Sequence, residues 1–412
     1  MTQTPLDVIV VGAGQAGLTS SYYLKKHKLS HIVFERGHIA QSWISQRWRS
    51  FTLTSPNVFA VLPGDKYEGP EPEVHMGAPE FAAYLNDYVS RYKLPVREKA
   101  KVLSVEFDEA SRLYHVAVSE NEQIAHYKSK QVIIASGSMN VMIIPPVANK
   151  MPAGLRHVHA GEYRFPAQLP EGAVLVVGSA QSGSQIAEDL NREGRKVFLA
   201  TSRVGRIPLI YRRKDIYHWV IDAVFFGVLM EKYGVPVDLS SPPSISLHEL
   251  ARRGVTLLGK LDKIEGDDLY FQLNVTEHIK YADQFSANVK KIIEAYIEEH
   301  KMEVDDPEYD QNDAPDELGC WDPMIPSINI KKENIQTVVW ATGFGNDYSY
   351  VKLPIFNEEG YPLHNYGITE IGGLYFPGLY GGSSIHGIGD NVRHIMERVC
   401  QYAAEPVNEV TV

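Results

Sequence analysis

The sequence predicts an α/β protein with two Rossmann-like dinucleotide-binding domains, the second of which is inserted into the first. Glycine-rich turns at residues 12–17 and 178–183 each follow a run of β-branched residues and precede a helical pattern. Two similar apolar runs, at residues 131–137 and 337–344, are typical of buried strands. This order indicates a chain that leaves its first domain, forms a second one and returns.

The length of 412 residues also favours two domains, because one core rarely serves so long a chain. We expect the first domain to comprise residues 1–150 and 331–412 and the second to comprise residues 151–330. Within the second domain, residues from about 207 to 330 are expected to form a helical insertion that shapes a pocket or a lid.

The first turn has the residues that a bound pyrophosphate requires. Gly12 permits a tight turn with positive φ, Gly14 leaves room for the phosphates, and Gly17 lets the next helix pack closely. The anion would then lie at the helix N-terminus. Glu35, at the end of the following strand, is placed to accept hydrogen bonds from the hydroxyls of an adenosine ribose.

The second turn repeats this pattern, but different residues stand at the end of the strand that follows it. Glu35 lies 23 residues after Gly12, and the same interval from Gly178 ends at Thr201, which Ser202 and Arg203 follow. A carboxylate would repel a 2′-phosphate, whereas hydroxyls and a guanidinium would bind it. The second ligand is therefore expected to be NADPH rather than NADH. Since Ala180 replaces the middle glycine, a turn that only stabilises the fold is the alternative.

Composition narrows the setting. The net charge of −11 argues against nucleic-acid partners and anionic membrane surfaces. The two cysteines, Cys320 and Cys400, form no C-x-x-C pair, and a reducing cytoplasm is expected. No export signal is readable before the first strand, and the most apolar stretch, 220–230, is too short to span a bilayer.

Further elements are expected from their patterns. Helices are predicted over 78–92, 181–192, 206–230 and 282–300, and an acidic loop over 304–317. Strands are predicted near residue 96 and over 101–107 and 114–118.

These motifs, together with the segment His159-Ala160-Gly161-Glu162-Tyr163-Arg164, resemble the class B flavin-dependent monooxygenases. The resemblance covers most of residues 1–215 and 335–400. It implies FAD in the first domain, NADPH in the second, and O₂ as co-substrate. In this family a flavin C4a-(hydro)peroxide transfers one oxygen atom to a small nucleophilic substrate, such as an amine, a sulfide or an electron-rich aromatic compound.

The family fingerprint F-x-G-x-x-x-H-x-x-x-(Y/F) is half present. His159 and Tyr163 match it, but Ala153 and Leu155 stand where Phe and Gly are expected. Tyr163 favours the N- and S-oxygenase branch over the Baeyer–Villiger branch. A linker histidine that holds a backbone turn is the alternative for His159.

The resemblance and the turn geometry together nominate the cofactor-binding residues. They are Gly12, Gly14, Gln15, Ala16, Gly17, Glu35, Arg36, Trp43, Arg47, Trp48, Val102, Gly137, Gly178, Ser179, Gln181, Ser182, Gly183, Thr201, Ser202, Arg203, Thr342, Gly343 and Asp390. Trp43 and Trp48 could equally be packing residues, Val102 an ordinary strand residue, and Asp390 a helix N-cap.

Two residues are candidates for catalysis. Asn57 could contact the flavin, NADP⁺ or oxygen through its amide, or it could order its own loop after Pro56. His386 could line the active site or face solvent. Arg206, Arg212 and Arg213 could bind phosphate or steer an anionic substrate, or they could be solvated surface residues.

Two other functions stay open. An NADPH-dependent flavin oxidase or reductase that releases H₂O₂ would need the same two cofactors, although the missing C-x-x-C disfavours thiol exchange. A non-catalytic redox sensor would use the nucleotides only to set its conformation. Because dimers are common for such folds, a homodimer is the expected assembly, and no metal site is expected.

Overall fold

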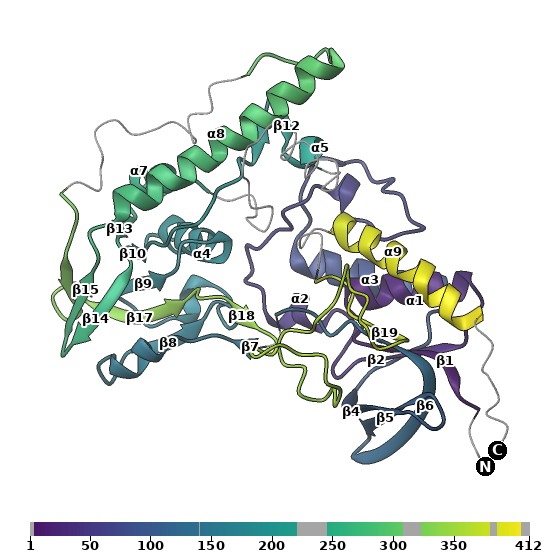
Figure 1. Ribbon diagram of the computed structural model, residues 1–412. Helices are drawn as coiled ribbons and strands as arrows, with labels where there is room; N and C mark the ends of the chain where they lie inside the picture. The colour runs from purple at the N-terminus through teal and green to yellow at the C-terminus, as the bar shows by residue number, and fades with distance from the viewer. Residues whose placement is uncertain (1–3, 140, 221–244, 308–322, 380–384, 405–412) are drawn as a thin grey trace. The chain divides into compact units, whose positions relative to one another are not determined.

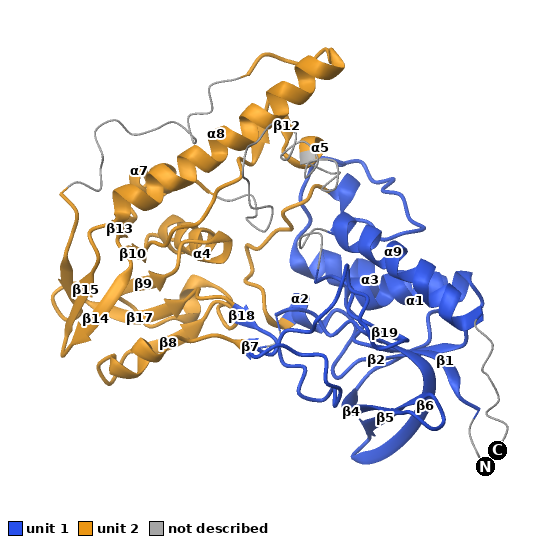
Figure 2. Ribbon diagram, viewed as in Figure 1, with its two compact units in different colours: residues 1–44, 57–141, 344–412 blue, residues 45–56, 142–343 orange. Residues whose placement is uncertain are grey.

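The computed structural model describes residues 4–139, 141–220, 245–307, 323–379 and 385–404, which form two compact units (Figures 1 and 2). Unit 1 comprises Met1–Ile44, Asn57–Val141 and Phe344–Val412, and unit 2 comprises Ser45–Pro56 and Met142–Gly343.

Unit 1 is built on a mixed sheet with the strand order β3-β2-β1-β6-β5-β4. Its elements are β1 (Leu6–Val11), α1 (Gln15–Lys26), β2 (His31–Phe34), α2 (Gln41–Ser45), α3 (Ala78–Tyr92), β3 (Val96–Arg97), β4 (Ala100–Asp108), β5 (Leu113–Glu120), β6 (Gln123–Ile134), β19 (Leu374–Tyr375) and α9 (Ile385–Ala404). Short strands β7 (Val141–Met142) and β18 (Phe344–Gly345) lie at the limits of the unit.

The long strand β6 takes part in both the antiparallel and the parallel part of this sheet. Its first half pairs with β5 in an antiparallel meander, and its second half pairs in parallel with β1 and β19. The β-branched residues of β1 predict this buried position, since Val8, Ile9 and Val10 are fully buried. Helices α3 and α9 both pack against α1 (Figure 1).

Unit 2 is built on a parallel sheet with the strand order β13-β10-β9-β17-β8. Its elements are β8 (Arg156–His159), β9 (Ala173–Val177), α4 (Gln181–Arg192), β10 (Val197–Ala200), β11 (Ile210–Tyr211), β12 (Lys214–Asp215), α5 (Tyr217–Val220), α7 (Leu247–Arg252), β13 (Thr256–Leu258), β14 (Leu261–Glu265), β15 (Asp268–Phe271), α8 (Val275–His300), β16 (Ser327–Asn329) and β17 (Ile335–Trp340).

The observed boundaries differ from the predicted ones. Unit 2 extends to Gly343, beyond the predicted limit at 330, because β17 inserts between β9 and β8. The segment 45–56 also belongs to unit 2, because Trp48 is buried in the core of that unit.

The insertion after residue 207 is not purely helical, so this part of the prediction is wrong. An antiparallel hairpin, β11–β12, occupies the first part of the predicted 206–230 helix, and residues 221–230 lie outside the described residues. Strands β14, β15 and β16 form a separate antiparallel sheet. The acidic loop is described only up to residue 307.

Helix α8 begins seven residues before the predicted start at 282. None of the described helices combines the length and the apolar composition that crossing a bilayer requires.

Candidate dinucleotide sites

The first glycine turn joins β1 to α1. Two positions of this turn require glycine. Gly12 has a φ of +104°, and a Cβ there would lie 2.5 Å from the carbonyl oxygen of Ala135. A Cβ at Gly17 would overlap the carbonyl oxygen of Gly12. Gly14 differs, because a Cβ at this position would meet no atom within 4 Å. This open space is what a pyrophosphate approaching the N-terminus of α1 requires.

The carboxylate of Glu35 lies at the same turn. Its Oε2 accepts a hydrogen bond from the backbone N–H of Ala13 at 2.8 Å, and its Oε1 accepts one from Gly37 at 2.9 Å. The residue is only 9% exposed, so the backbone holds the carboxylate in one place. Each carboxylate oxygen can accept a second hydrogen bond, and both are therefore available to ribose hydroxyls.

The second turn joins β9 to α4 with the same geometry. Gly178 has a φ of +103°, and a Cβ there would lie 2.5 Å from the carbonyl oxygen of Ala341. A Cβ at Gly183 would overlap the carbonyl oxygen of Gly178. Ala341 follows β17 as Ala135 follows β6. The two similar apolar runs therefore have the same role, because each places the carbonyl of an alanine against a glycine turn.

Ala180 occupies the position of Gly14. Both residues precede their helix with extended backbone, at φ −84° and ψ −174° for Gly14 and at φ −68° and ψ 179° for Ala180. An L-residue adopts this conformation without strain. The second turn therefore differs from the first by one methyl group on the side that faces a pyrophosphate.

Ser202, and not Thr201, faces the second turn. The backbone N–H of Ser202 donates to Ser179 Oγ at 2.9 Å. Thr201 is 1% exposed, and its hydroxyl donates to the carbonyl of Leu258 at 2.7 Å and lies 2.9 Å from Nδ1 of His278. The Thr201 hydroxyl is thus bonded inside the fold, and a ligand contact by this residue stays a prediction.

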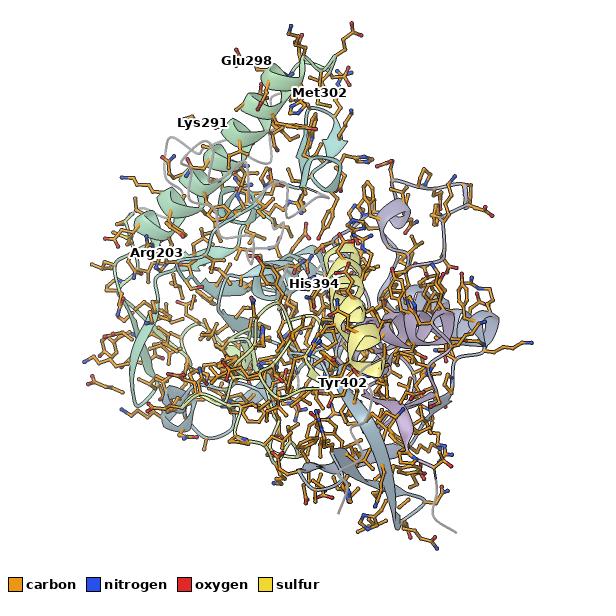
Figure 3. The ribbon with its side chains drawn as sticks, turned by 45° about the vertical axis from the view of Figure 1, so that its right-hand side comes forward. Arg203, Lys291, Glu298, Met302, His394 and Tyr402 are labelled. Carbon is orange, nitrogen blue, oxygen red and sulfur yellow. The ribbon has the colours of Figure 1, made fainter. Side chains whose placement is uncertain are left out.

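Arg203 is exposed beside α8. Its guanidinium carbon lies 4.3 Å from the centre of the Tyr281 ring, and Figure 3 shows the residue beside this helix. A small pocket lies next to the turn, lined by Ser179, Ser202, Val204, Gly205, Arg206, Ile245, Leu247 and Ala282. Arg206 is buried in its wall. Tyr281 and Ala282 follow the turn by about a hundred residues, so no local motif could have indicated them.

Two buried amide groups support a polar ligand at each turn. Gln15 and Gln181 are the first residues of α1 and α4, respectively. Gln15 Oε1 and Gln181 Nε2 are buried and have no hydrogen-bond partner in the described protein. Such groups are costly without a partner. The residues at both turns therefore fit dinucleotides.

Trp43, Arg47 and Trp48, three of the nominated cofactor-binding residues, lie in different surroundings. Trp43 is half-buried in unit 1, with its ring edge-to-face on Phe81 at 4.9 Å. Trp48 is 4% exposed in the core of unit 2 and is a packing residue. Burial lowers the pKa of Arg47 to about 10, and repulsion from Arg164 adds to the effect.

Asn57 orders its own loop. Its Nδ2 donates to the carbonyl of Glu71 at 2.9 Å and to the hydroxyl of Tyr67 at 3.3 Å, and its Oδ1 accepts the N–H of Met76 at 3.0 Å. Asn57 is 6% exposed. These contacts favour the alternative, a structural role, and the catalytic role of Asn57 stays a prediction.

The C-terminal candidates lie on α9. Asp390 is in the second turn of this helix, and its carboxylate pairs with His386 at 3.3 Å and with Arg393 at 2.8 Å. Asp390 is therefore not the N-cap of the helix. The side chain of His386 is 48% exposed, and its catalytic role stays a prediction.

The other nominated residues have ordinary surroundings. Val102 is buried in β4, and Arg36 is exposed beside Glu35. Gly137 and Gly343 both have positive φ, and Thr342 donates to the carbonyl of Ile143. Cofactor contacts by these residues also stay predictions.

Comparisons with known proteins agree with this arrangement. Residues 9–208 match the pyridine nucleotide-disulphide oxidoreductase family. An uncharacterized CzcO-like oxidoreductase of Geobacillus kaustophilus is 28% identical over 96% of this chain and 99% of its own length. The probable indole-3-pyruvate monooxygenase YUCCA10 of Arabidopsis thaliana is 26% identical over 94% and 97%. The flavin-containing monooxygenase of Stenotrophomonas maltophilia shares the fold, with a TM-score of 0.65, 18% identity and coverage of 98% and 100%.

Over nearly its whole length the chain is similar to class B flavin-dependent monooxygenases, and it shares their fold. The predicted fold class and the predicted enzyme class, a flavin-dependent monooxygenase, are thereby confirmed. The name of the matched family refers to disulphide chemistry, and this sequence has no C-x-x-C pair.

The monooxygenase fingerprint histidine is a buried structural group. His159 is 1% exposed, its Nε2 donates to the carbonyl of Gly343 at 3.0 Å, and its Nδ1 accepts the N–H of Gly161 at 3.1 Å. Only the neutral ring can make both bonds. Burial lowers the pKa of His159, because the charged ring would lose its hydration.

This pairing predicts a pH-dependent stability. Below the ordinary histidine pKa of about 6.5 the unfolded chain binds a proton at His159 that the folded chain resists, so acid favours unfolding. His159→Gln should lower the thermal midpoint at alkaline pH, and the gap to the wild type should narrow as the pH falls through this range. A constant gap at every pH would contradict the neutral assignment.

The fingerprint tyrosine supports a buried carboxylate. Tyr163 is fully buried, and its hydroxyl donates to Asp189 at 2.7 Å. Tyr163→Phe should cost about 1–3 kcal/mol of unfolding free energy, because Asp189 loses a donor while it stays buried. Urea denaturation would measure this change. The exposed-site control Tyr361→Phe should stay within about 0.5 kcal/mol.

Proposed function

We propose that the protein uses NADPH, FAD and O₂ to transfer one oxygen atom to a small nucleophilic substrate. FAD and NADPH are the cofactors of this family, in agreement with the expectation from the two turns. The observation that carries the proposal is the contrast at the turns, with a fixed carboxylate at the first and with Ser202 and Arg203 at the second. The first turn suits an adenosine ribose with free hydroxyls, and the second turn suits a ribose that carries a 2′-phosphate.

At the first turn, the chain would bind and orient FAD. The N–H groups at the start of α1 would hold the pyrophosphate, and Glu35 would accept hydrogen bonds from the ribose hydroxyls. When bound, FAD supplies the redox chemistry, namely reduction by NADPH and activation of O₂. Unit 1 itself therefore needs to provide position and shelter from water rather than an acid–base pair.

At the second turn, the chain would select NADPH. The exposed guanidinium of Arg203, oriented by Tyr281, and the hydroxyl of Ser202 would bind the 2′-phosphate. Arg206 in the pocket wall adds positive charge to the same place. No carboxylate is among the residues that line this pocket.

The substrate is proposed only by class. Amines, sulfides and electron-rich aromatic compounds such as indoles have the nucleophilic atom that an oxygen transfer of this kind needs. We place the enzyme in the cytoplasm, since the cysteine pattern suits a reducing compartment. We also propose that it forms a homodimer.

Product analysis under ¹⁸O₂ tests the reaction. The purified yellow protein would be reduced anaerobically with NADPH and mixed with oxygenated buffer, first alone and then with a panel of amines, sulfides and indoles. We expect a delayed return of the oxidised flavin spectrum and one ¹⁸O atom in a product. Immediate return with stoichiometric H₂O₂ for every compound would favour the oxidase, and no turnover of NADPH would favour the redox sensor.

A further inference from the structure

A continuous series of aromatic rings runs through unit 1 from α2, along α3, to α1. Six successive ring pairs have centroid separations between 4.6 and 6.2 Å. In order, the rings belong to Trp43, Phe81, Tyr84, Tyr88, Tyr92, Tyr22 and Tyr23. We call these residues the ring series.

The sequence places the ring series on one helix face. Residues 81, 84, 88 and 92 of α3 recur every three or four positions, so their side chains share a stripe. Trp43 begins the series close to the first glycine turn, since its N–H donates to the carbonyl of Ala40, whose own N–H donates to Ala13. Tyr22 and Tyr23 end the series with partly exposed rings.

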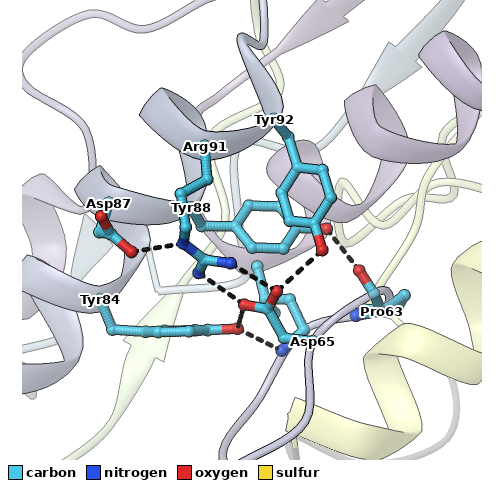
Figure 4. A network of polar contacts seen from close by, with 8 residues as sticks. Pro63, Asp65, Tyr84, Asp87, Tyr88, Arg91 and Tyr92 are labelled. Carbon is cyan, nitrogen blue, oxygen red and sulfur yellow. Dashed lines mark hydrogen bonds and ion pairs between the residues drawn. The ribbon is translucent and has the colours of Figure 1, made fainter.

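Three hydroxyl groups of the ring series have hydrogen-bond acceptors, and two of them share one carboxylate. Tyr84 and Tyr92 each donate to a different oxygen of Asp65 at 2.8 Å, and Tyr88 donates to the carbonyl of Pro63 at 2.7 Å (Figure 4). Arg91 binds both oxygens of Asp65 at 2.7 Å. Packing alone would be satisfied by phenylalanine at these positions, without hydroxyls that need partners.

Asp65 is kept ready to accept a proton. Burial would raise the pKa of Asp65, but hydrogen bonds from Arg91, Tyr92 and Tyr84 outweigh it and hold the pKa below its usual range. Asp65 is therefore ionised at neutral pH. A phenol that loses an electron becomes a strong acid, and a carboxylate at hydrogen-bond distance can take its proton.

We propose that the ring series carries oxidising equivalents away from the first dinucleotide site to the surface at Tyr22 and Tyr23. The proposal rests on the proposed function, because FAD-dependent oxygen activation is the source of a damaging one-electron oxidant. The ring series would protect the enzyme when oxygen activation releases such an oxidant.

Each step balances. A reactive oxygen radical, or photoexcited flavin in the test below, takes one electron from the indole of Trp43. Tyr84 then reduces the oxidised indole across the Phe81 ring, which is not itself oxidised. The phenolic proton of Tyr84 passes to Asp65. When Tyr92 in turn reduces Tyr84 across the Tyr88 ring, Asp65 returns that proton to Tyr84 and accepts the one from Tyr92. Tyr22 then reduces Tyr92, which takes its proton back from Asp65, and the phenolic proton of Tyr22 passes to water. A small-molecule thiol gives one electron and one proton to the Tyr22 radical and leaves as a thiyl radical.

Blue-light excitation of the FAD-loaded protein tests this path. Ferricyanide would reoxidise the flavin, and rapid freezing followed by electron paramagnetic resonance would count tyrosyl radicals. We expect a tyrosyl signal in the wild type and loss of most of it in Tyr84→Phe, Tyr92→Phe and Trp43→Phe. Trp43→Phe should also increase flavin fluorescence, because its quencher is gone. The control Tyr361→Phe, outside the ring series, should keep the full signal.

A further variant separates the ring series from mere packing. Asp65→Asn retains the ring contacts but removes the proton acceptor, so packing alone predicts an unchanged signal and the proposal predicts its loss. Full signal in Tyr84→Phe and Tyr92→Phe overturns the proposal even if Asp65→Asn does not fold. Yellow wild-type protein without a tyrosyl signal overturns it and leaves the proposed function standing. Colourless wild-type protein overturns both.

Discussion

Replacement of Gly14 by valine should give a folded protein without yellow colour. A side chain at this position meets no atom of the protein, and the backbone is already in a conformation that L-residues adopt, so the fold tolerates it. It would, however, fill the space in which the pyrophosphate of FAD lies. Loss of two charge-assisted hydrogen bonds at about 1.5–3 kcal/mol each would weaken FAD by roughly 10²- to 10⁴-fold.

Flavin absorbance per purified protein, together with circular dichroism, would measure this result. Ala180→Val is the matched control, because it places the same side chain at the equivalent position of the second turn. We expect it to retain FAD and to lose NADPH. Gly17→Val should fail to fold, since its Cβ would overlap the carbonyl of Gly12. Normal FAD content in Gly14→Val would refute the first site.

Replacement of Arg203 by alanine should change the choice between the two nicotinamide cofactors. A charge-assisted hydrogen bond to the 2′-phosphate contributes about 1.5–3 kcal/mol, so KM for NADPH should rise roughly 10- to 150-fold. NADH has no such phosphate, and its KM should hardly change. The rate of flavin reduction at varied NADPH and NADH would measure both values.

A surface control makes this test specific. Lys263, on β14, is exposed and pairs with Glu265, so Lys263→Ala removes one positive charge of unit 2 away from the turn. It should affect neither cofactor. An equal loss of NADPH and NADH affinity in Arg203→Ala would mean that Arg203 supports the fold or the shared part of the ligand.

The glycine turns could be predicted because each requirement is local. Gly12 and Gly178 need positive φ, and Gly17 and Gly183 need a missing Cβ, so the residue type reports the geometry directly. Helices α3 and α4 also coincide with their predictions, since their apolar periodicity is uninterrupted.

Side-chain direction was harder to predict. Counting from Gly178 led to Thr201, but the hydroxyl of this residue turns towards Leu258, and Ser202 faces the ligand side. The role of Asn57 was left open for the same reason, because its partners Glu71 and Met76 lie in a loop without a recognisable pattern. Long-range contacts such as that of Arg203 with Tyr281 leave no trace in local sequence.

The course of the chain limits how this protein can be divided. Residues 45–56 leave unit 1, supply Trp48 to the core of unit 2 and the hydroxyl of Ser50 to Asp189, and return. A gene fragment that encodes only 142–343 would therefore lack part of its own hydrophobic interior. The nucleotide unit cannot be moved as one cassette into another protein. Recombination between relatives would have to exchange residues 45–56 together with 142–343 to yield a stable chimera.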